Sequence, residues 1–377
     1  MIRRRKIVAL SKGQSKGRYR VTINDLSREL GLTKGTVSRA LNGYDDISES
    51  TRTRVARAAE RMGYRPLAQA QAIRTGMARA LGLVLNAGPD NTHKPFLTDF
   101  LDGISRAASE EGWSLSIATA LDEQDEVATI ARLVAEHKVD GFILPRTRVS
   151  DPRIDLLRDL EVPFVLYGRT GDTEGCAWHD ISGEDAMRDA VLRLHGLGHQ
   201  RIGFVNGDSG FNYAPLRRDG YLAGLAEAGL PHDPDLVRSG AITPQQGMAR
   251  GAELLDLPNP PTAIVCALDR AALGVYRAAE ARGLRIGRDL SVIAYDGIPE
   301  AATATPPLTT FAVDTRAAGA RLAKLLFARI RGADLNHLRE VVPAHLIARG
   351  SDGPPPNTEP GPARNTGPTP PTQKGET

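Results

Sequence analysis

The 377-residue chain has only two cysteines, Cys176 and Cys266. Two cysteines cannot build a disulfide framework, and such scarcity is typical of proteins from a reducing compartment. No unbroken apolar run approaches the roughly 18 residues that a membrane helix needs, and the N-terminal residues lack the apolar stretch of a signal peptide. These absences predict a cytoplasmic protein without a membrane segment.

Catalytic and metal-binding motifs are missing as well. The sequence has no Walker loop, no Gly-x-Gly-x-x-Gly after an expected strand and no His-Glu-x-x-His. Gly207-Asp-Ser-Gly210 lacks the full spacing of a nucleophile elbow. The four-residue spacing of His195 and His199 permits a shared metal, but packing at a helix end is the simpler explanation. We therefore expect no enzyme, no cofactor and no metal site.

Positive charge is concentrated in the first fifth of the chain. The whole chain has 48 Lys and Arg against 45 Asp and Glu, whereas residues 1–80 have 18 against 6. Such a local excess is the electrostatic footprint of a protein that binds a polyanion, and the remainder of the chain is acidic. Residues 1–20 taken alone are equally consistent with a basic disordered leader.

Residues 21–66 have the pattern of three short helices. The first begins with a capping box formed by Thr22 and Asp25, and Gly31 ends it. The second begins at Thr33, directly after this tight turn, and the third begins near Ser48. Two helices separated by a glycine turn, with a third closing a small core, predict a helix-turn-helix. The side chains expected in that core are Ile23, Leu26, Leu30, Val37, Ala40, Leu41, Val55, Ala59 and Met62.

The outward face of the second helix suits the reading of DNA bases. Arg39 can fork onto the O6 and N7 acceptors of guanine, and Lys34 can reach the same edge as a point charge. Gly35 and Ser38 share this face. Short polar side chains around the motif suit phosphate oxygens, although the Ser and Thr among them can also serve as helix caps. These side chains are Thr22, Thr33, Thr36, Asn42, Ser48 and Thr51.

Three blocks in this order resemble the lactose repressor (LacI/GalR) family: residues 21–42, residues 47–52 and residues 63–66. The resemblance extends to about residue 352. It implies that the first two positions of the second helix and the arginine five residues into it read bases. Because Gly35 has no side chain, Lys34 and Arg39 are expected to carry most of the direct readout.

Residues 67–76 follow a proline and end at a glycine, with good helix formers between them. So short a helix is marginal in water, so we expect it to form only against a partner or DNA. The resemblance implies a hinge helix that pairs with a second copy and inserts a side chain into the minor groove. Ile73 takes the place of the family's leucine there, between Ala70 and Arg74. A plain linker is the alternative.

From residue 77 to residue 352 short apolar runs alternate with helical segments, which predicts parallel α/β sheets. The resemblance implies two doubly wound lobes built like periplasmic sugar-binding proteins, with the strand after Leu308 and the helix from Thr315 crossing between them. Strands are expected at 80–86, 114–120, 141–145, 164–169, 201–206, 263–267 and 290–296, with helices at 98–111 and 186–197.

Ligands of open α/β sheets bind at the carboxyl ends of the strands, which two lobes collect in one cleft. By resemblance, Arg217 and Asp296 match the effector-binding arginine and aspartate of the family. Asp269 matches the aspartate of an Asn-Asp pair whose asparagine is here Leu268. A guanidinium and a carboxylate facing across a cleft suit vicinal sugar hydroxyls, although each can instead form a surface salt bridge.

Aromatic side chains near strand ends are further effector candidates, because their faces can stack on a sugar ring or pack in the core. They are Phe96, Tyr167, Phe211 and Tyr213. Arg169 can bind a hydroxyl or a phosphate. Ser182-Gly183 stands where the family commonly has Asp-Asn, and Gly297 follows Asp296 in place of a second acid. Fewer polar groups beside extra aromatics favour a glycoside or oligosaccharide.

From about Gly353 the composition collapses to Pro, Gly, Thr and Asn, which predicts a flexible tail over residues 353–377. The tail does not resemble a tetramer-forming leucine repeat, so a homodimer is expected.

The sequence therefore predicts a DNA-binding transcriptional regulator. In the simplest case it represses genes of carbohydrate uptake or catabolism from a pseudopalindromic operator, and a sugar or glycoside in the cleft releases it. Two other functions stay open: a cytoplasmic sugar-binding module whose basic N-terminus is incidental, and an architectural DNA-binding protein with a vestigial cleft. An enzyme built on the same lobes is a more distant alternative.

Overall fold

The computed structural model describes residues 21–65, 76–87 and 94–356. The chain divides into two compact units, Met1–Ala78 and Arg79–Thr377. The predicted leader, the hinge positions Ala70, Ile73 and Arg74, and residues 357–377 of the predicted tail lie outside the described residues.

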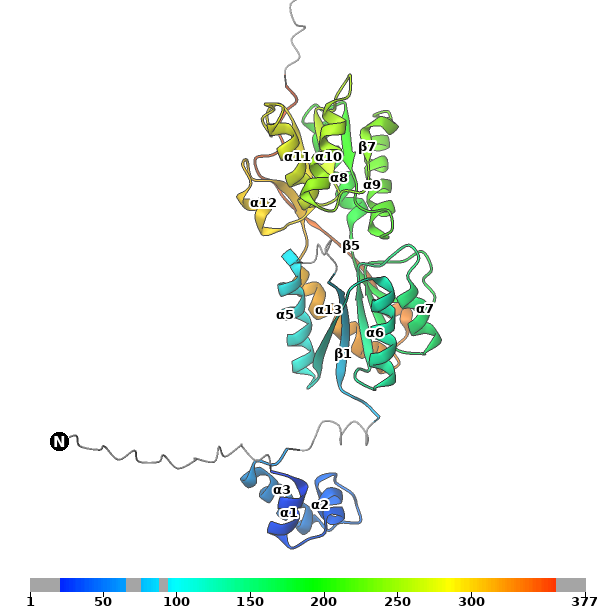
Figure 1. The fold of residues 1–377 in the computed structure, drawn as a ribbon, viewed down its shortest axis with the longest axis vertical. Coiled ribbons are helices and arrows are strands. Elements are labelled where there is room, and N and C mark those ends of the chain that lie inside the picture. Colours follow the sequence, from blue (N-terminus) through cyan, green and yellow to red (C-terminus); the bar gives the residue numbers. More distant parts are fainter. Residues whose placement is uncertain (1–20, 66–75, 88–93, 357–377) are drawn as a thin grey trace, which may run out of the picture. The chain divides into compact units, whose positions relative to one another are not determined.

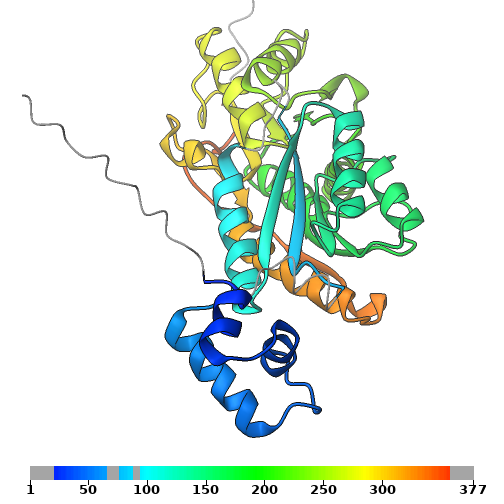
Figure 2. The same ribbon diagram turned by 60° about the horizontal axis from the view of Figure 1, so that its bottom comes forward.

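The first unit is a headpiece of three helices, α1 (Ile23–Leu30), α2 (Lys34–Leu41) and α3 (Glu49–Met62) (Figure 2). Thr22 and Asp25 form the expected capping box, and Gly31 ends α1 with a φ of 63°, a left-handed conformation that glycine adopts without strain. Leu26, Val37 and Val55 are fully buried where the three helices meet. The predicted helix-turn-helix is confirmed.

The second unit has two lobes, each with a six-stranded sheet (Figure 1). In the first lobe the strands are all parallel, in the order β11-β5-β4-β3-β1-β2. Helices α5 and α13 cover one face of this sheet, while α6 and α7 cover the other. The elements are β1 (Ala80–Asn86), α5 (Lys94–Glu110), β2 (Ser114–Ala120), α6 (Glu123–Ala135), β3 (Gly141–Pro145), α7 (Pro152–Asp159), β4 (Phe164–Tyr167), β5 (Ala177–Ser182), α13 (Thr315–Ile330), the 3₁₀ helix Leu335–His337 and β11 (Arg339–Pro343).

In the second lobe the strand order is β12-β10-β9-β8-β6-β7, and only the β10–β12 pair is antiparallel. Helices α10 and α11 pack together, as do α8 and α9. The elements are α8 (Gly183–Gly196), β6 (Ile202–Val205), α9 (Tyr213–Glu227), the 3₁₀ helix Pro234–Leu236, β7 (Val237–Arg238), α10 (Pro244–Leu255), β8 (Ala263–Cys266), α11 (Asp269–Glu280), β9 (Ser291–Asp296), α12 (Pro299–Thr303), β10 (Thr309–Ala312) and β12 (His345–Ile347).

The chain crosses between the lobes three times, from β5 to α8, from β10 to α13 and from β11 to β12. The second crossing is the one expected after Leu308 and from Thr315. Strands of both lobes end at the space between the lobes. Side chains from the carboxyl ends of β3, β4, β5 and β9 therefore line the same cavity. The expected fold of a helix-turn-helix headpiece followed by two doubly wound lobes is confirmed.

Several element boundaries differ from the sequence expectation. The strand expected over 164–169 ends at Tyr167, because Gly168 has a φ of 109° that breaks the extended backbone. Helices α5 and α8 begin four and three residues earlier than expected. Strand β5 was not expected, because His179 and Asp180 interrupt its apolar pattern, and β7, β11 and β12 are short or polar.

The tail was expected to begin at Gly353, but this residue is part of the second lobe. The N–H of Gly353 donates to Ser291 Oγ at 3.0 Å, and its carbonyl lies 2.9 Å from Nε2 of His199. His199 is buried and its Nδ1 contacts Thr262, so it holds the C-terminal segment in place. Within the described ranges no group of three His, Cys, Asp or Glu side chains is placed to hold a metal, and no helix is long and apolar enough to cross a membrane.

Candidate functional site

The surface of α2 places the predicted base-reading residues together. Lys34, Gly35 and Arg39 are exposed and Ser38 is half-buried, whereas Val37 faces the core. The N-cap of this helix is Thr33, whose hydroxyl accepts from the Thr36 N–H at 3.1 Å. A short exposed helix with a polar and basic outer face is the geometry that enters a DNA major groove.

Five of the six predicted phosphate contacts fall into two groups, and the sixth, Asn42, donates its side-chain amide to Ser38 Oγ at 3.4 Å. The Thr33, Thr36, Ser48 and Thr51 hydroxyls bond to one another in pairs at 2.9 Å, and a hydroxyl that caps a helix retains capacity for a further partner. Thr22 differs, because both its N–H and its hydroxyl donate to the Asp25 carboxylate. That carboxylate also repels a phosphate, so Thr22 is less suited to a phosphate contact than the four hydroxyls above.

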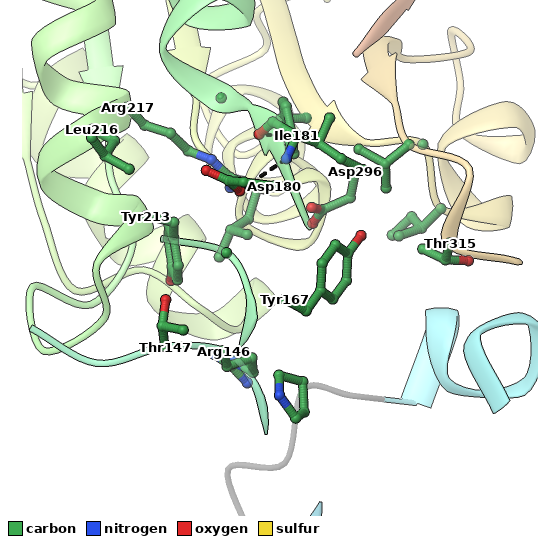
Figure 3. Close-up of a pocket in the computed structure, with 18 of the residues that line it drawn as sticks. Arg146, Thr147, Tyr167, Asp180, Ile181, Tyr213, Leu216, Arg217, Asp296 and Thr315 are labelled. Atoms are coloured by element: carbon green, nitrogen blue, oxygen red, sulfur yellow. Dashed lines mark hydrogen bonds between the residues drawn. The ribbon is translucent and has the colours of Figure 1, made fainter. Parts of the chain in front are cut away.

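The second candidate site is a cavity of about 290 Å³ between the two lobes. This volume is close to the lower end of the range of small-molecule sites, roughly 300 to 1,000 Å³. Five of the predicted effector residues line it: Tyr167, Arg169, Tyr213, Arg217 and Asp296. Figure 3 shows Arg217 reaching from α9 and Asp296 from the end of β9 toward the same space beside the Tyr167 ring.

Arg217 is held with little freedom. Its guanidinium carbon lies 4.7 Å from the centroid of the Tyr213 ring and 3.9 Å from that of Tyr295, and its Nη1 donates to the Ala267 carbonyl. A Cβ at Gly183 would come within 2.9 Å of Arg217 Nε, so glycine at that position leaves room for the side chain. The residue is 8% exposed, and its buried Nε has no hydrogen-bond partner among the described residues.

Asp296 faces the cavity from a strained backbone. Its φ of 126° lies where L-residues are rare, which costs of order 1 to 3 kcal/mol. Desolvation raises the pKa of its carboxyl to about 6, against the opposing effect of Arg217 and Arg146. A ligand with hydroxyl donors therefore finds in this carboxylate an acceptor on the wall of the cavity.

Asp269 does not line the cavity, contrary to the expectation from its resemblance. It is fully buried at the start of α11, where Oδ2 accepts from the N–H groups of Gly297 and Ile298 at 2.8 and 2.9 Å. Thr310 donates to Oδ1 at 2.6 Å. Asp269 thus fixes the loop that follows Asp296, and it acts on the cavity through that loop.

Phe211 is likewise not among the cavity-lining residues. Its ring stacks on Tyr213, and the guanidinium of Arg146 lies 4.4 Å from its centroid. The Phe211 segment joins the lobes, because the Asn212 N–H donates to the Thr147 carbonyl at 2.9 Å and its side-chain amide donates to the Arg169 carbonyl at 2.8 Å. The side chain of Phe96 lies outside the described residues.

Arg169 lines the cavity but has partners within the protein. Its Nε donates to Asp180 at 2.6 Å and its Nη2 to Glu184. Asp180, Glu184 and Arg146 are cavity residues that the sequence argument missed. Arg146 directly follows the strand expected at 141–145, so the strand-end rule contained the signal for it. Asp180 lies on β5, which was not recognised as a strand.

Two family descriptions match the chain. Residues 22–66 match the bacterial regulatory proteins of the lacI family, and residues 191–351 match a periplasmic binding protein-like domain. Among curated relatives, the HTH-type transcriptional regulator AglR of Rhizobium meliloti (strain 1021) is 38% identical over 346 residues, which are 90% of this chain and 96% of that protein.

Solved structures agree with these matches. The lac repressor dimer bound to operator and the anti-inducer ONPF has a TM-score of 0.75 at 25% identity, covering 89% of this chain and 99% of that one. The complex of the transcriptional regulator CelR with cellobiose has a TM-score of 0.68 at 31% identity, covering 88% and 100%. Both likenesses span the headpiece and the two lobes.

Proposed function

Because the chain belongs to the lacI family of bacterial regulatory proteins, we propose that it is a sequence-specific transcriptional regulator whose DNA binding is controlled by a sugar or glycoside in the interlobe cavity. The carrying observation is that Arg217 and Asp296 face one cavity, where the buried Nε of Arg217 has no hydrogen-bond partner among the described residues. It acts as a binding protein rather than an enzyme, in the cytoplasm where bacterial DNA lies.

DNA reading is assigned to the outer face of α2. Lys34 and Arg39 contact base edges, with Ser38 beside them and the backbone of Gly35 approaching closely. Thr33, Thr36, Asn42, Ser48 and Thr51 contact phosphates, which position the headpiece without specifying sequence. Two headpieces are needed for a pseudopalindromic operator, so the acting species is a homodimer whose paired hinges contact the minor groove through Ala70, Ile73 and Arg74.

The chemistry of the cavity favours a neutral carbohydrate. Arg217 donates and Asp296 accepts, which matches the paired donor and acceptor character of vicinal hydroxyls. The rings of Tyr167 and Tyr213 line the same space and offer faces for a sugar ring. That CelR, a structural neighbour, is solved with cellobiose supports this ligand class.

Regulation follows from the position of the cavity between two lobes. A ligand that bonds Arg217 on one lobe and Tyr167 on the other favours one relative position of the lobes over another. Transmitted to the hinge, such a shift weakens operator binding by a coupling of about 1 to 3 kcal/mol. The gene set under this control is one for carbohydrate uptake or catabolism, repressed until the sugar is present.

The test is a binding assay with the whole chain. Operator duplexes are first selected from a random library, and a panel of mono- and disaccharides is then tested for release of the protein from the selected duplex. One panel member should weaken operator binding about 5- to 150-fold, and Asp296→Asn should abolish that response while binding the duplex normally.

Asp235→Asn, an exposed aspartate of the same lobe, is the matched control and should respond as the wild type does. Selection of no sequence, with sugar binding intact, would instead identify a sugar-binding module. Selection of a sequence without any ligand response would identify a ligand-independent DNA-binding protein.

A further inference from the structure

The base-reading arginine of α2 is already bonded to an acidic side chain. Arg39 Nη1 donates to Asp46 Oδ2 at 2.7 Å, and the two side chains are 50% and 51% exposed. An exposed pair of this kind contributes little to folding, because water and salt screen its charges and both side chains lose freedom when they pair. The contact matters instead because it fixes the orientation of the Arg39 guanidinium.

The position of Asp46 is fixed by the turn that follows α2. The Tyr44 N–H donates to the carbonyl of Arg39 itself at 3.1 Å, and the Ile47 N–H donates to the Tyr44 carbonyl at 3.2 Å. Ile47 is 7% exposed and packs in the headpiece core. Asp46 therefore lies between an anchored turn and a buried side chain, and its carboxylate is held beside Arg39 by the fold.

The contact leaves the reading edge of Arg39 available. Arginine has five N–H donors in a rigid fork, and Asp46 takes one of them through Nη1. The Nε and Nη2 donors on the remaining edge match the O6 and N7 acceptors of guanine. A guanidinium that is already oriented loses less rotamer freedom when it binds than a freely rotating one does.

Resting on the proposed function, we propose that Asp46 is a positioning residue for base reading, which holds Arg39 in the orientation that reads guanine. Free of this contact, the guanidinium can reach phosphates of any sequence, which raises non-specific binding and lowers the preference for the operator. Asp46 thus sets the specificity of the regulator through Arg39.

The neighbouring acid supplies a matched control. The Asp45 carboxylate is fully exposed and lies 3.7 Å from Arg52, away from Arg39. Asp45→Asn and Asp46→Asn each remove one negative charge from the same turn, so both increase the general attraction to DNA by a similar factor. Any difference between the two variants reports the contact with Arg39.

The experiment compares the full-length wild type, Asp45→Asn and Asp46→Asn on two duplexes. One is the consensus that the wild type selects from a random library, and the other has the same length and composition in scrambled order. The ratio of the two affinities should be unchanged in Asp45→Asn and should fall about 5- to 20-fold in Asp46→Asn. Equal ratios in the two variants, or a higher ratio in Asp46→Asn, would overturn the proposal.

A double-mutant cycle separates positioning from a structural effect. In an Arg39→Ala background, Asp46→Asn and Asp45→Asn should give the same affinity ratio, because the group that Asp46 positions is gone. A loss of specificity that persists in that background would overturn the positioning role. A wild type that selects no consensus would overturn the proposed function together with this inference, whereas the previous outcomes overturn the inference alone.

Discussion

Asp269 shows how one buried carboxylate ties protein stability to pH. Desolvation, together with the nearby charge of Asp296, raises the pKa of Asp269 to about 7, although three hydrogen bonds from Thr310, Ile298 and Gly297 oppose the shift. An ionised carboxylate with this pKa is less favourable in the folded chain than in the unfolded one. The stabilisation that it gives in protonated form is complete below about pH 4 and is lost as the pH rises through about 7.

We predict that Asp269→Asn removes this pH dependence. Between about pH 4 and pH 7 the unfolded chain has released the Asp269 proton while the folded chain still holds it. The free energy of unfolding of the wild type therefore falls with rising pH, by up to about 1.4 kcal/mol per unit from this group. An asparagine can keep all three hydrogen bonds, with its oxygen accepting both backbone N–H groups and its amide donating to Thr310 Oγ1.

The measurement is thermal unfolding by calorimetry from about pH 4.5 to about pH 8, a range that covers most of this window and its upper end. The melting temperature of Asp269→Asn should fall less steeply than that of the wild type, and Asp235→Asn should follow the wild type. Parallel curves for Asp269→Asn and the wild type would show that this carboxyl does not titrate in the window.

Asp269 also shows why the position of a residue in the sequence does not determine its role in the structure. The strand-end rule and the resemblance together identified Arg217, Asp296, Tyr167 and Tyr213 as cavity residues. They also selected Asp269, because a pattern cannot distinguish a side chain that points into a cleft from one that points under the neighbouring loop. That distinction depends on the orientation of α11 beneath β9, which is a tertiary property.

At the scale of elements, strands with a continuous or alternating apolar sequence were predicted closely, and polar strands were missed. Strands β1 and β3 are continuous apolar runs, β2 alternates, and all three have the expected bounds. By contrast, β5 contributes Asp180 to the cavity, and its polar residues hid it from a pattern based on hydrophobicity. A strand that ends in a binding site is expected to break the apolar pattern, because function requires polar groups there.

Helix α8 illustrates a constraint that an element places on the site. Its first residue, Gly183, has no side chain, and a Cβ there would meet Arg217 Nε at 2.9 Å and Cγ at 3.0 Å. Its last residue, Gly196, has nothing within 4 Å of the equivalent position. The two glycines therefore allow one substitution to be compared at a crowded and at an open end of the same helix.

We predict that Gly183→Ala weakens sugar binding about 10-fold or more, because Arg217 must move away from its place between Tyr213 and Tyr295. Gly196→Ala should leave sugar affinity unchanged and should stabilise the helix by up to about 1 kcal/mol. Calorimetric titration with the sugar that the panel experiment identifies, together with thermal unfolding, gives both quantities. Equal sugar affinities in the two variants would show that the position of Arg217 does not govern binding.

At the scale of the whole molecule, the headpiece and the two lobes belong to separate compact units, and the predicted hinge positions lie in the sequence between α3 and β1. In a regulator of this kind, the binding of a ligand to the lobes must change the affinity of the headpiece for DNA. Thermodynamic linkage makes this exchange reciprocal: if the sugar weakens operator binding by some factor, the operator must weaken sugar binding by the same factor.

This reciprocity gives the last prediction. The affinity of the full chain for the selected operator is measured with and without saturating sugar, and the affinity for the sugar is measured with and without saturating operator. The two ratios should agree and should lie between about 5 and 150, which corresponds to a coupling of about 1 to 3 kcal/mol.

The control is a scrambled duplex, which is bound through charge alone. It should shift sugar affinity far less, because it does not require the ordered arrangement of two headpieces. If both ratios were 1, sugar binding in the cavity would have no effect on DNA binding. Unequal ratios would show that the sugar changes the association of the subunits rather than the state of an intact dimer.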